Sequence, residues 1–194
     1  MKEKIFKKFQ RSIEVKQDFI EKNINNIMAV SELLINTLKQ GKKIFICGNG
    51  GSATDSLHFA GELVNRLQFD HPPLPVISLN ADIATLTAIA NDYGYSEIFA
   101  KPLEAYGKED DAIILVSTSG NSENLINACY IAKELGIKTI ALLGKTGGLL
   151  KDLVDIPLIV NDQFSGRIQE THITILHILA ELIEDTLFGN DNEN

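Results

Sequence analysis

Two residues suited to proton transfer, His58 and Glu62, lie four positions apart in a segment with helical periodicity. Residues at this spacing project from the same face of a helix, so the imidazole and the carboxylate are expected to lie side by side. Such a pair can act as general acid and base, or supply two ligands to a metal ion. The alternative is a polar pair that is solvated or satisfied within the core, which is the commoner role of a single pair.

A further histidine, His177, interrupts a strongly apolar run that contains Leu176, Ile178 and Leu179. An isolated histidine in such a run is usually a buried residue with a local hydrogen bond. Together with His58 and Glu62 it would complete an acid–base or metal-binding cluster if the fold brings the two segments together. The sequence leaves both interpretations open.

Two segments rich in glycine and hydroxyl groups each follow a short apolar run: residues 48–52 are Gly-Asn-Gly-Gly-Ser, and residues 117–122 are Ser-Thr-Ser-Gly-Asn-Ser. Glycine lets the backbone approach an anion, N–H groups at a helix start point at it, and hydroxyls add neutral donors. Neither segment has the spacing of a dinucleotide fingerprint or the lysine of a P-loop. They predict a site for a phosphate and a polyhydroxylated chain. The alternative is two ordinary turns with N-caps at Ser52 and at Asn121 or Ser122.

A third polar cluster follows the second predicted strand. It contains Asn80, Asp82, Asn91, Asp92 and Tyr93. Local chemistry favours a binding site and a helix-ending turn equally.

The apolar runs before these polar clusters are short and continuously apolar, which favours strands covered on both faces. Helical stretches alternate with them, so the sequence predicts an α/β fold with a doubly wound parallel sheet of about five strands. Ligands bind at the carboxyl ends of the strands in such folds. The predicted strands cover 44–47, 75–79, 112–116, 139–143 and 156–160, and the predicted helices cover 52–68, 82–90, 121–135, 147–152 and 165–188.

The first forty residues carry two apolar stripes at helical spacing, one from Ile5 to Ile20 and one from Ile27 to Leu38. They predict an N-terminal helical pair that ends near Gly41. The predicted organisation is therefore N-terminal helices over 1–41, a single α/β domain over 42–188, and a frayed polar tail over 189–194. We expect the N-terminal helices to serve assembly, the alternative being that they only cover one face of the sheet.

The chain has 194 residues and a formal net charge of −8. A surface of this sign repels duplex nucleic acid and anionic membranes, although a local basic pocket for a small anion is compatible with it. No apolar stretch approaches the ~20 residues of a membrane span, and no apolar segment of a signal peptide follows the basic start. Cys47 and Cys129 lie in apolar runs and are expected to be buried thiols. A cytoplasmic, soluble protein is the expectation.

Five motifs, in this order and spacing, resemble the phosphoheptose isomerase family of the sugar isomerase (SIS) domain superfamily. They are the segments 47–52 (CGNGGS), 58–63 (HFAGEL), 91–94 (NDYG), 117–122 (STSGNS) and 167–173 (RIQETHI). The resemblance covers nearly the whole chain. It implies conversion of sedoheptulose 7-phosphate to D-glycero-D-manno-heptose 7-phosphate through an enediol. That reaction is the first step of ADP-heptose biosynthesis for bacterial surface glycans such as lipopolysaccharide. It also implies a homotetramer with active sites at subunit interfaces.

The resemblance also implies roles for individual residues. Glu62 and His177 match the catalytic base and acid. Four positions match those that bind zinc in some members, with one ion per subunit: His58, Glu62, Gln169 and His177. Besides Glu62 and Gln169, the positions that match substrate contacts are Asn49, Gly50, Gly51, Ser52, Asn91, Asp92, Ser117, Thr118, Ser119 and Ser122.

Two features of the chain stand against a simple transfer of this pattern. Gln169 and His177 are eight residues apart, which is about 12 Å along a helix, so one ion needs a bent helix, convergent side chains or a second subunit to reach both. Many members carry an acidic residue at the position of Gly166, and Asp162 is a candidate to replace it. The loop residue His71, beside two prolines, is expected to be exposed.

Two other functions remain as alternatives. One is a non-catalytic SIS module that binds a protein partner, like the relative that associates with the replication initiator DnaA, or that senses a sugar phosphate. The other is an isomerase for a different phosphorylated ketose. The presence of Glu62 with both His58 and His177 favours the enzyme.

Overall fold

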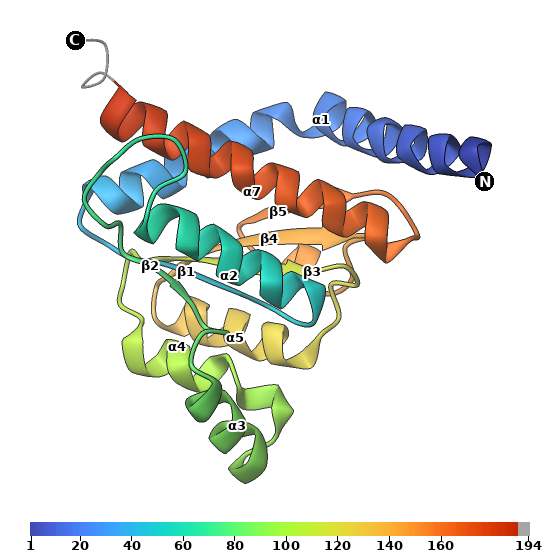
Figure 1. Ribbon diagram of the computed structural model, residues 1–194. Coiled ribbons are helices and arrows are strands. Elements are labelled where there is room, and N and C mark those ends of the chain that lie inside the picture. The colour runs from blue at the N-terminus through green and yellow to red at the C-terminus, as the bar shows by residue number, and fades with distance from the viewer. Residues whose placement is uncertain (190–194) are drawn as a thin grey trace.

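Five parallel strands form one sheet in the order β2-β1-β3-β4-β5, as the computed structural model, which describes residues 1–189, shows (Figure 1). All four pairings are parallel, which confirms the predicted doubly wound α/β fold. The strands are β1 (Ile44–Gly48), β2 (Val76–Ser78), β3 (Ala112–Ser117), β4 (Lys138–Gly144) and β5 (Ile156–Val160).

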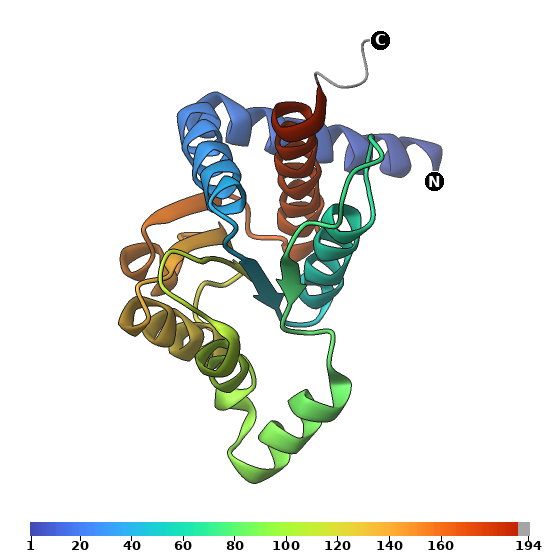
Figure 2. The same ribbon diagram turned by 90° about the vertical axis from the view of Figure 1, so that its left-hand side faces the viewer.

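Helices cover both faces of the sheet because successive strand residues point to opposite sides and nearly all are apolar. Ile44 and Ile46 of β1 pack with α1, α2 and α7, whereas Phe45 and Cys47 pack with α4 and α5. Figure 2 shows these two helical layers edge on. The helices are α1 (Lys2–Lys39), α2 (Gly51–Val64), α3 (Ile83–Asp92), the 3-10 turn η1 (Tyr95–Glu97), α4 (Ala100–Tyr106), α5 (Glu123–Glu134), α6 (Leu150–Leu153) and α7 (Ser165–Phe188).

The N-terminal region is one helix rather than the predicted pair. Helix α1 runs without a break over 38 residues, because no glycine or proline interrupts it. It ends before Gly41, whose φ of +70° lies in the left-handed region. The second apolar stripe is buried against the sheet, but the first leaves Ile5, Phe6 and Phe9 between 60% and 72% exposed.

The connection from β2 to β3 holds two elements that the sequence analysis missed, η1 and α4. Helix α3, which precedes them, has no buried residue and projects away from the sheet (Figures 1 and 2). The polar residues Asn91 and Asp92 at its end are exposed, and the Asn91 amide donates a hydrogen bond to the Asp92 carboxylate. The predicted frayed tail lies outside the described residues, apart from Gly189.

Both cysteines are buried, as expected, and burial raises the pKa of the Cys129 thiol to about 11 and that of Cys47 further. None of the helices between residues 1 and 189 has the length and apolar character needed to cross a membrane.

The expectation that His71 is exposed is wrong, because its side chain is fully covered. His71 stacks on Phe188 and lies 3.0 Å, measured from its Nε2 atom, from a carboxylate oxygen of Glu184 on α7. The buried Glu184 carboxylate also accepts hydrogen bonds from the backbone N–H groups of Leu67, Gln68 and Phe69. This carboxylate therefore anchors the loop that follows α2.

Replacing Glu184 with glutamine is expected to lower the free energy of unfolding by about 2–4 kcal/mol, because a buried charged acceptor of several N–H groups is lost. Burial opposes ionisation of Glu184, but its hydrogen bonds outweigh burial and hold its pKa below the ordinary 4.5. The stabilisation is therefore present above that value and lost as the pH falls below it. Urea unfolding from pH 7 to pH 3.5 measures the effect. Glu181→Gln, exposed on the same helix, is the control.

Candidate active site

The two glycine- and serine-rich turns meet at the carboxyl edge of the sheet. The first follows β1 and the second follows β3, and these strands are direct neighbours, with Gly48 paired to Val116. The chain continues from β1 to β2 on one side and reaches β3 on the other, which makes this edge the switch point where ligands bind in such folds. The predicted convergence of the two turns is therefore observed.

The first turn is shaped by its glycines and by Asn80. Gly50, at the N-cap of α2, has a φ of +58°, and no side chain caps this helix, so Ser52 is not the predicted N-cap but lies buried inside α2. The Asn80 side chain donates to the Gly48 carbonyl and accepts from the Gly48 N–H, at 3.0 and 3.2 Å. The sequence analysis did not decide whether Asn80 belongs to a binding site or to a turn. In the structure its side chain fixes the end of β1.

In the second turn, two of the hydroxyl groups accept hydrogen bonds from the backbone of the turn itself. The buried Ser117 hydroxyl accepts the Gly120 N–H at 3.0 Å, and the Ser119 hydroxyl accepts the Asn121 N–H at 3.2 Å. Thr118, Ser119 and Ser122 are half-buried at the edge. Gly120, with a φ of +67°, lies against the backbone of Gly147, where an added Cβ would meet the carbonyl oxygen at 1.9 Å, so only glycine fits.

An amide pair joins the two turns across the sheet edge. The Asn49 and Asn124 carboxamides exchange two hydrogen bonds of 2.9 Å each, and the Tyr95 hydroxyl donates to Asn49 at 2.8 Å. The sequence analysis missed Asn124 and Tyr95, because nothing in the local pattern indicates contacts with Asn49 over separations of 75 and 46 residues.

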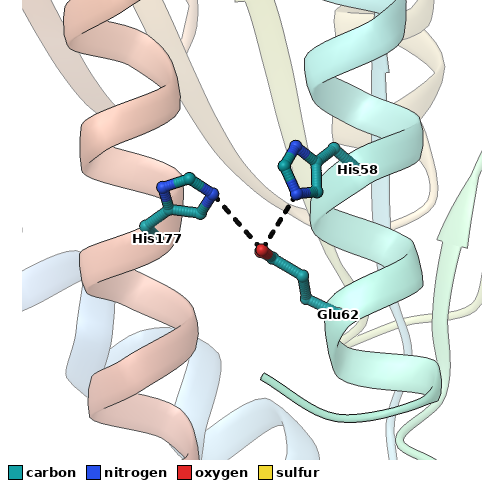
Figure 3. Close-up of side chains that lie close together, drawn as sticks. All are labelled: His58, Glu62 and His177. Carbon is teal, nitrogen blue, oxygen red and sulfur yellow. Dashed lines mark ion pairs between the residues drawn. The ribbon is translucent and has the colours of Figure 1, made fainter. Parts of the chain in front are cut away.

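The third group of side chains lies between α2 and α7, which pack side by side. Figure 3 shows one carboxylate oxygen of Glu62 facing both imidazoles: Oε1 is 3.1 Å from Nε2 of His58 and 3.3 Å from Nε2 of His177. The two rings meet edge to face at 5.1 Å. Glu62 is nearly buried, whereas the His58 and His177 side chains are 54% and 38% exposed.

This cluster has the composition and spacing of a metal site. The ligand atoms of His58, Glu62 and His177 all lie within 4.8 Å of one another. The second oxygen of Glu62 is buried without a hydrogen-bond partner. A buried carboxylate oxygen left unpaired is costly, and a cation held with two imidazoles would compensate for it.

Gln169 lies at the other end of the same helix pair. An added Cβ at Gly51 would meet its Nε2 at 2.6 Å, so the Gln169 side chain covers the start of α2. The helices run parallel, with Gly51 beside Gln169 and His58 and Glu62 beside His177. Gln169 is thus about two helical turns from the cluster within this chain. The role of Gln169 as fourth ligand stays a prediction. It needs a bent helix, convergent side chains or a ligand from a second subunit.

Asp55, one turn before His58, is a neighbour of the cluster that the sequence analysis missed. One of its carboxylate oxygens is buried without a partner. Burial raises the pKa of Asp55, and the charges of His58 and His177 partly oppose that rise. Its position three residues before His58, on the same helix face, is the signal that could have revealed it.

Asp162 and His172 have structural roles. Asp162 pairs with Arg11 of α1 at 2.6 Å and accepts the Phe164 N–H at 2.7 Å, so it holds the loop before α7. Burial opposes the ionisation of Asp162, but these bonds outweigh it and lower its pKa. His172 is buried with its Nε2 at 3.0 Å from the Leu143 carbonyl oxygen, and burial lowers its pKa to about 4.

Comparison with known proteins agrees with this geometry. The SIS domain family matches residues 8–144. The phosphoheptose isomerase of Thermodesulfovibrio yellowstonii is 50% identical over 188 residues, covering 97% of this chain and 94% of the relative. Two solved phosphoheptose isomerases superpose closely: that of Neisseria gonorrhoeae with a TM-score of 0.89 at 36% identity, covering 95% and 98% of the two chains, and that of Francisella tularensis with 0.88 at 38%, covering 94% and 97%.

The parallel sheet, the two turns at its switch point and the matched residues define an SIS domain protein. Within that class, the chain belongs to the phosphoheptose isomerase family of enzymes. The resemblance drawn from the five motifs is thereby confirmed.

Proposed function

We propose that the protein is an aldose–ketose isomerase that interconverts sedoheptulose 7-phosphate and D-glycero-D-manno-heptose 7-phosphate. The observation that carries the proposal is the position of the Glu62 carboxylate between the Nε2 atoms of His58 and His177, in a chain of this family. The product would enter ADP-heptose synthesis for bacterial surface glycans.

The reaction moves one proton between two carbons and one between two oxygens. Glu62 takes a proton from C1 of the ketose while His177 gives one to the C2 oxygen, which forms the enediol. His177 then takes the proton from the C1 oxygen and Glu62 returns its proton to C2, which forms the aldose. A carboxylate and an imidazole 3.3 Å apart suit this exchange, because both groups can serve neighbouring carbons of one substrate.

The phosphate and the hydroxyl groups of the sugar fit the two turns. Backbone N–H groups at the start of α2 and the half-buried hydroxyls of Thr118, Ser119 and Ser122 are neutral donors. Gly51 and Gln169 close the first turn on the α7 side. We assign the remaining predicted contacts to Asn49, Gly50, Ser52, Ser117 and, from the α3 arm, Asn91 and Asp92.

Zinc fits the histidine–glutamate cluster. His58, Glu62 and His177 would hold the ion, and Gln169 is the predicted fourth ligand. Two imidazole nitrogens and one carboxylate oxygen form a donor set of the zinc type. When bound, zinc supplies Lewis acidity that polarises the carbonyl of the substrate.

The alternative of a non-catalytic module is disfavoured, because a binding protein needs neither the acid–base cluster nor its exposure. Turnover of a different ketose phosphate is separated from the main proposal by comparing substrates of different chain length. We further infer a cytoplasmic enzyme, in keeping with its two buried thiols and net charge of −8.

The enzyme is expected to be a homotetramer. Apolar residues on the first half of α1 and on α3 are exposed in the single chain, and surfaces of this kind are commonly buried between subunits. Light scattering on the purified protein should give about four times the chain mass of 21.4 kDa. A monomer at micromolar concentration would contradict this expectation.

Glu62→Gln is expected to lower turnover of sedoheptulose 7-phosphate by about 10²–10⁴-fold, because glutamine keeps the shape but cannot accept the C1 proton. An isomerisation assay that follows formation of the aldose measures the change. Glu104→Gln, an exposed glutamate on α4, should keep wild-type turnover. A wild-type protein that is folded but does not convert the heptose would overturn the proposal.

Removal of metal with a chelator should be reversed by zinc, and calorimetry of the stripped protein should show one ion per subunit. His58→Ala is expected to weaken zinc binding by at least about tenfold, because one nitrogen ligand is lost. Gln169→Ala tests the fourth ligand. An equal loss would support its participation, and an unchanged affinity would restrict Gln169 to the turn at Gly51.

A further inference from the structure

The amide of Asn124 is buried, and both its oxygen and its nitrogen are bonded to Asn49. Asn124 is the second residue of α5, it is 2% exposed, and its carboxamide donates to Oδ1 of Asn49 and accepts from Nδ2 of Asn49. A buried amide that loses both bonds is left unpaired at substantial cost, so this pair resists rotation of either side chain. Asn124 thereby acts on Asn49 from the opposite turn.

The hydrogen-bonding capacity of Asn49 can be counted atom by atom. Its Oδ1 can accept two bonds, and it receives one from Asn124 at 2.9 Å and one from the Tyr95 hydroxyl at 2.8 Å. Its Nδ2 can donate two, and one goes to Asn124 at 2.9 Å. One N–H of a half-buried side chain at the mouth of the site is what Asn49 retains for a ligand.

Tyr95 is the second partner of the Asn49 oxygen in the orientation that the amide pair adopts. If both amides were flipped, the two bonds between Asn49 and Asn124 would survive, but Asn49 would then offer a carbonyl oxygen to the ligand instead of an N–H. The structure has the first arrangement: the Tyr95 hydroxyl donates to Oδ1, and Asn49 keeps an N–H for the ligand. The 3-10 turn η1 that carries Tyr95 packs against α5, so Tyr95 and Asn124 are held by the same neighbouring elements.

We propose that Asn124 and Tyr95 are positioning residues that fix the Asn49 carboxamide, so that Asn49 offers the sugar phosphate a single N–H donor and no acceptor. The group that Asn49 binds is therefore an acceptor oxygen of the substrate: a carbonyl, hydroxyl or phosphate oxygen. This inference builds on the proposed function, because it assigns a role within the same site.

Three variants test the proposal by kinetics. Tyr95→Phe removes the donor to Oδ1 and is expected to lower kcat/KM about tenfold, chiefly through KM. Asn124→Asp keeps the shape but cannot donate to Asn49, and Asn124→Ala removes the pair; both are expected to lower kcat/KM about 10–100-fold, because a mobile amide no longer orients the substrate. Tyr106→Phe on α4 and Asn36→Ala on α1, both at exposed positions, are the matched controls and should retain wild-type kinetics.

A second readout does not depend on turnover or on overall stability. In NMR spectra of the free wild-type protein, one Nδ2 proton of Asn49 should exchange slowly with water and the other rapidly. Added inorganic phosphate or sedoheptulose 7-phosphate should shift the rapid one. Asn124→Ala, which removes the acceptor of the slow proton, should abolish the slow exchange in a protein whose other amide signals are unchanged.

Wild-type kinetics in both Tyr95→Phe and Asn124→Asp would overturn the proposal, as would equal, rapid exchange of both Asn49 protons in the wild-type protein. Failure of the proposed function gives a different pattern: a folded wild-type protein without turnover, in which the slow Asn49 proton still supports the positioning by Asn124.

Discussion

The side-by-side pairing of β1 and β3 is the constraint on which the rest of the site depends. Each strand ends in a turn at the same edge, and Gly48 is in register with Val116, so the turns cannot separate without breaking the centre of the sheet. The backbone bonds of the ladder therefore position Asn49 opposite Asn124. The same pairing fixes the starts of the helices that follow these turns, α2 and α5.

The helix pair α2 and α7 extends that order away from the sheet. Both helices begin at the ligand-binding edge and run parallel, so residues at equal distances from their starts face each other. One meeting point is Gly51 with Gln169, and the other, about two turns further, is His58 and Glu62 with His177. Binding groups at the edge and proton-transfer groups further along thus lie on the same pair of packed helices.

Much of this arrangement could be predicted from the sequence, because its signals are local. Continuous apolar runs indicated all five strands, and the spacing of His58 and Glu62 indicated a shared helix face. Contacts over long separations were missed: Tyr95 with Asn49, and His71 with Glu184, which made a loop histidine buried. The continuity of α1 was misjudged because a change of apolar stripe was taken as a break, although no residue there ends a helix.

The anchor at Glu184 has a consequence for how this protein can diversify. Its carboxylate holds the loop after α2 through the main-chain N–H groups of residues 67, 68 and 69. A main-chain N–H group does not depend on the side chain that its residue carries. The exposed position 68 can therefore accept any residue except proline, which lacks the N–H, while the path of the loop stays fixed. Sequence changes at this position can therefore alter the surface of the loop without changing its path.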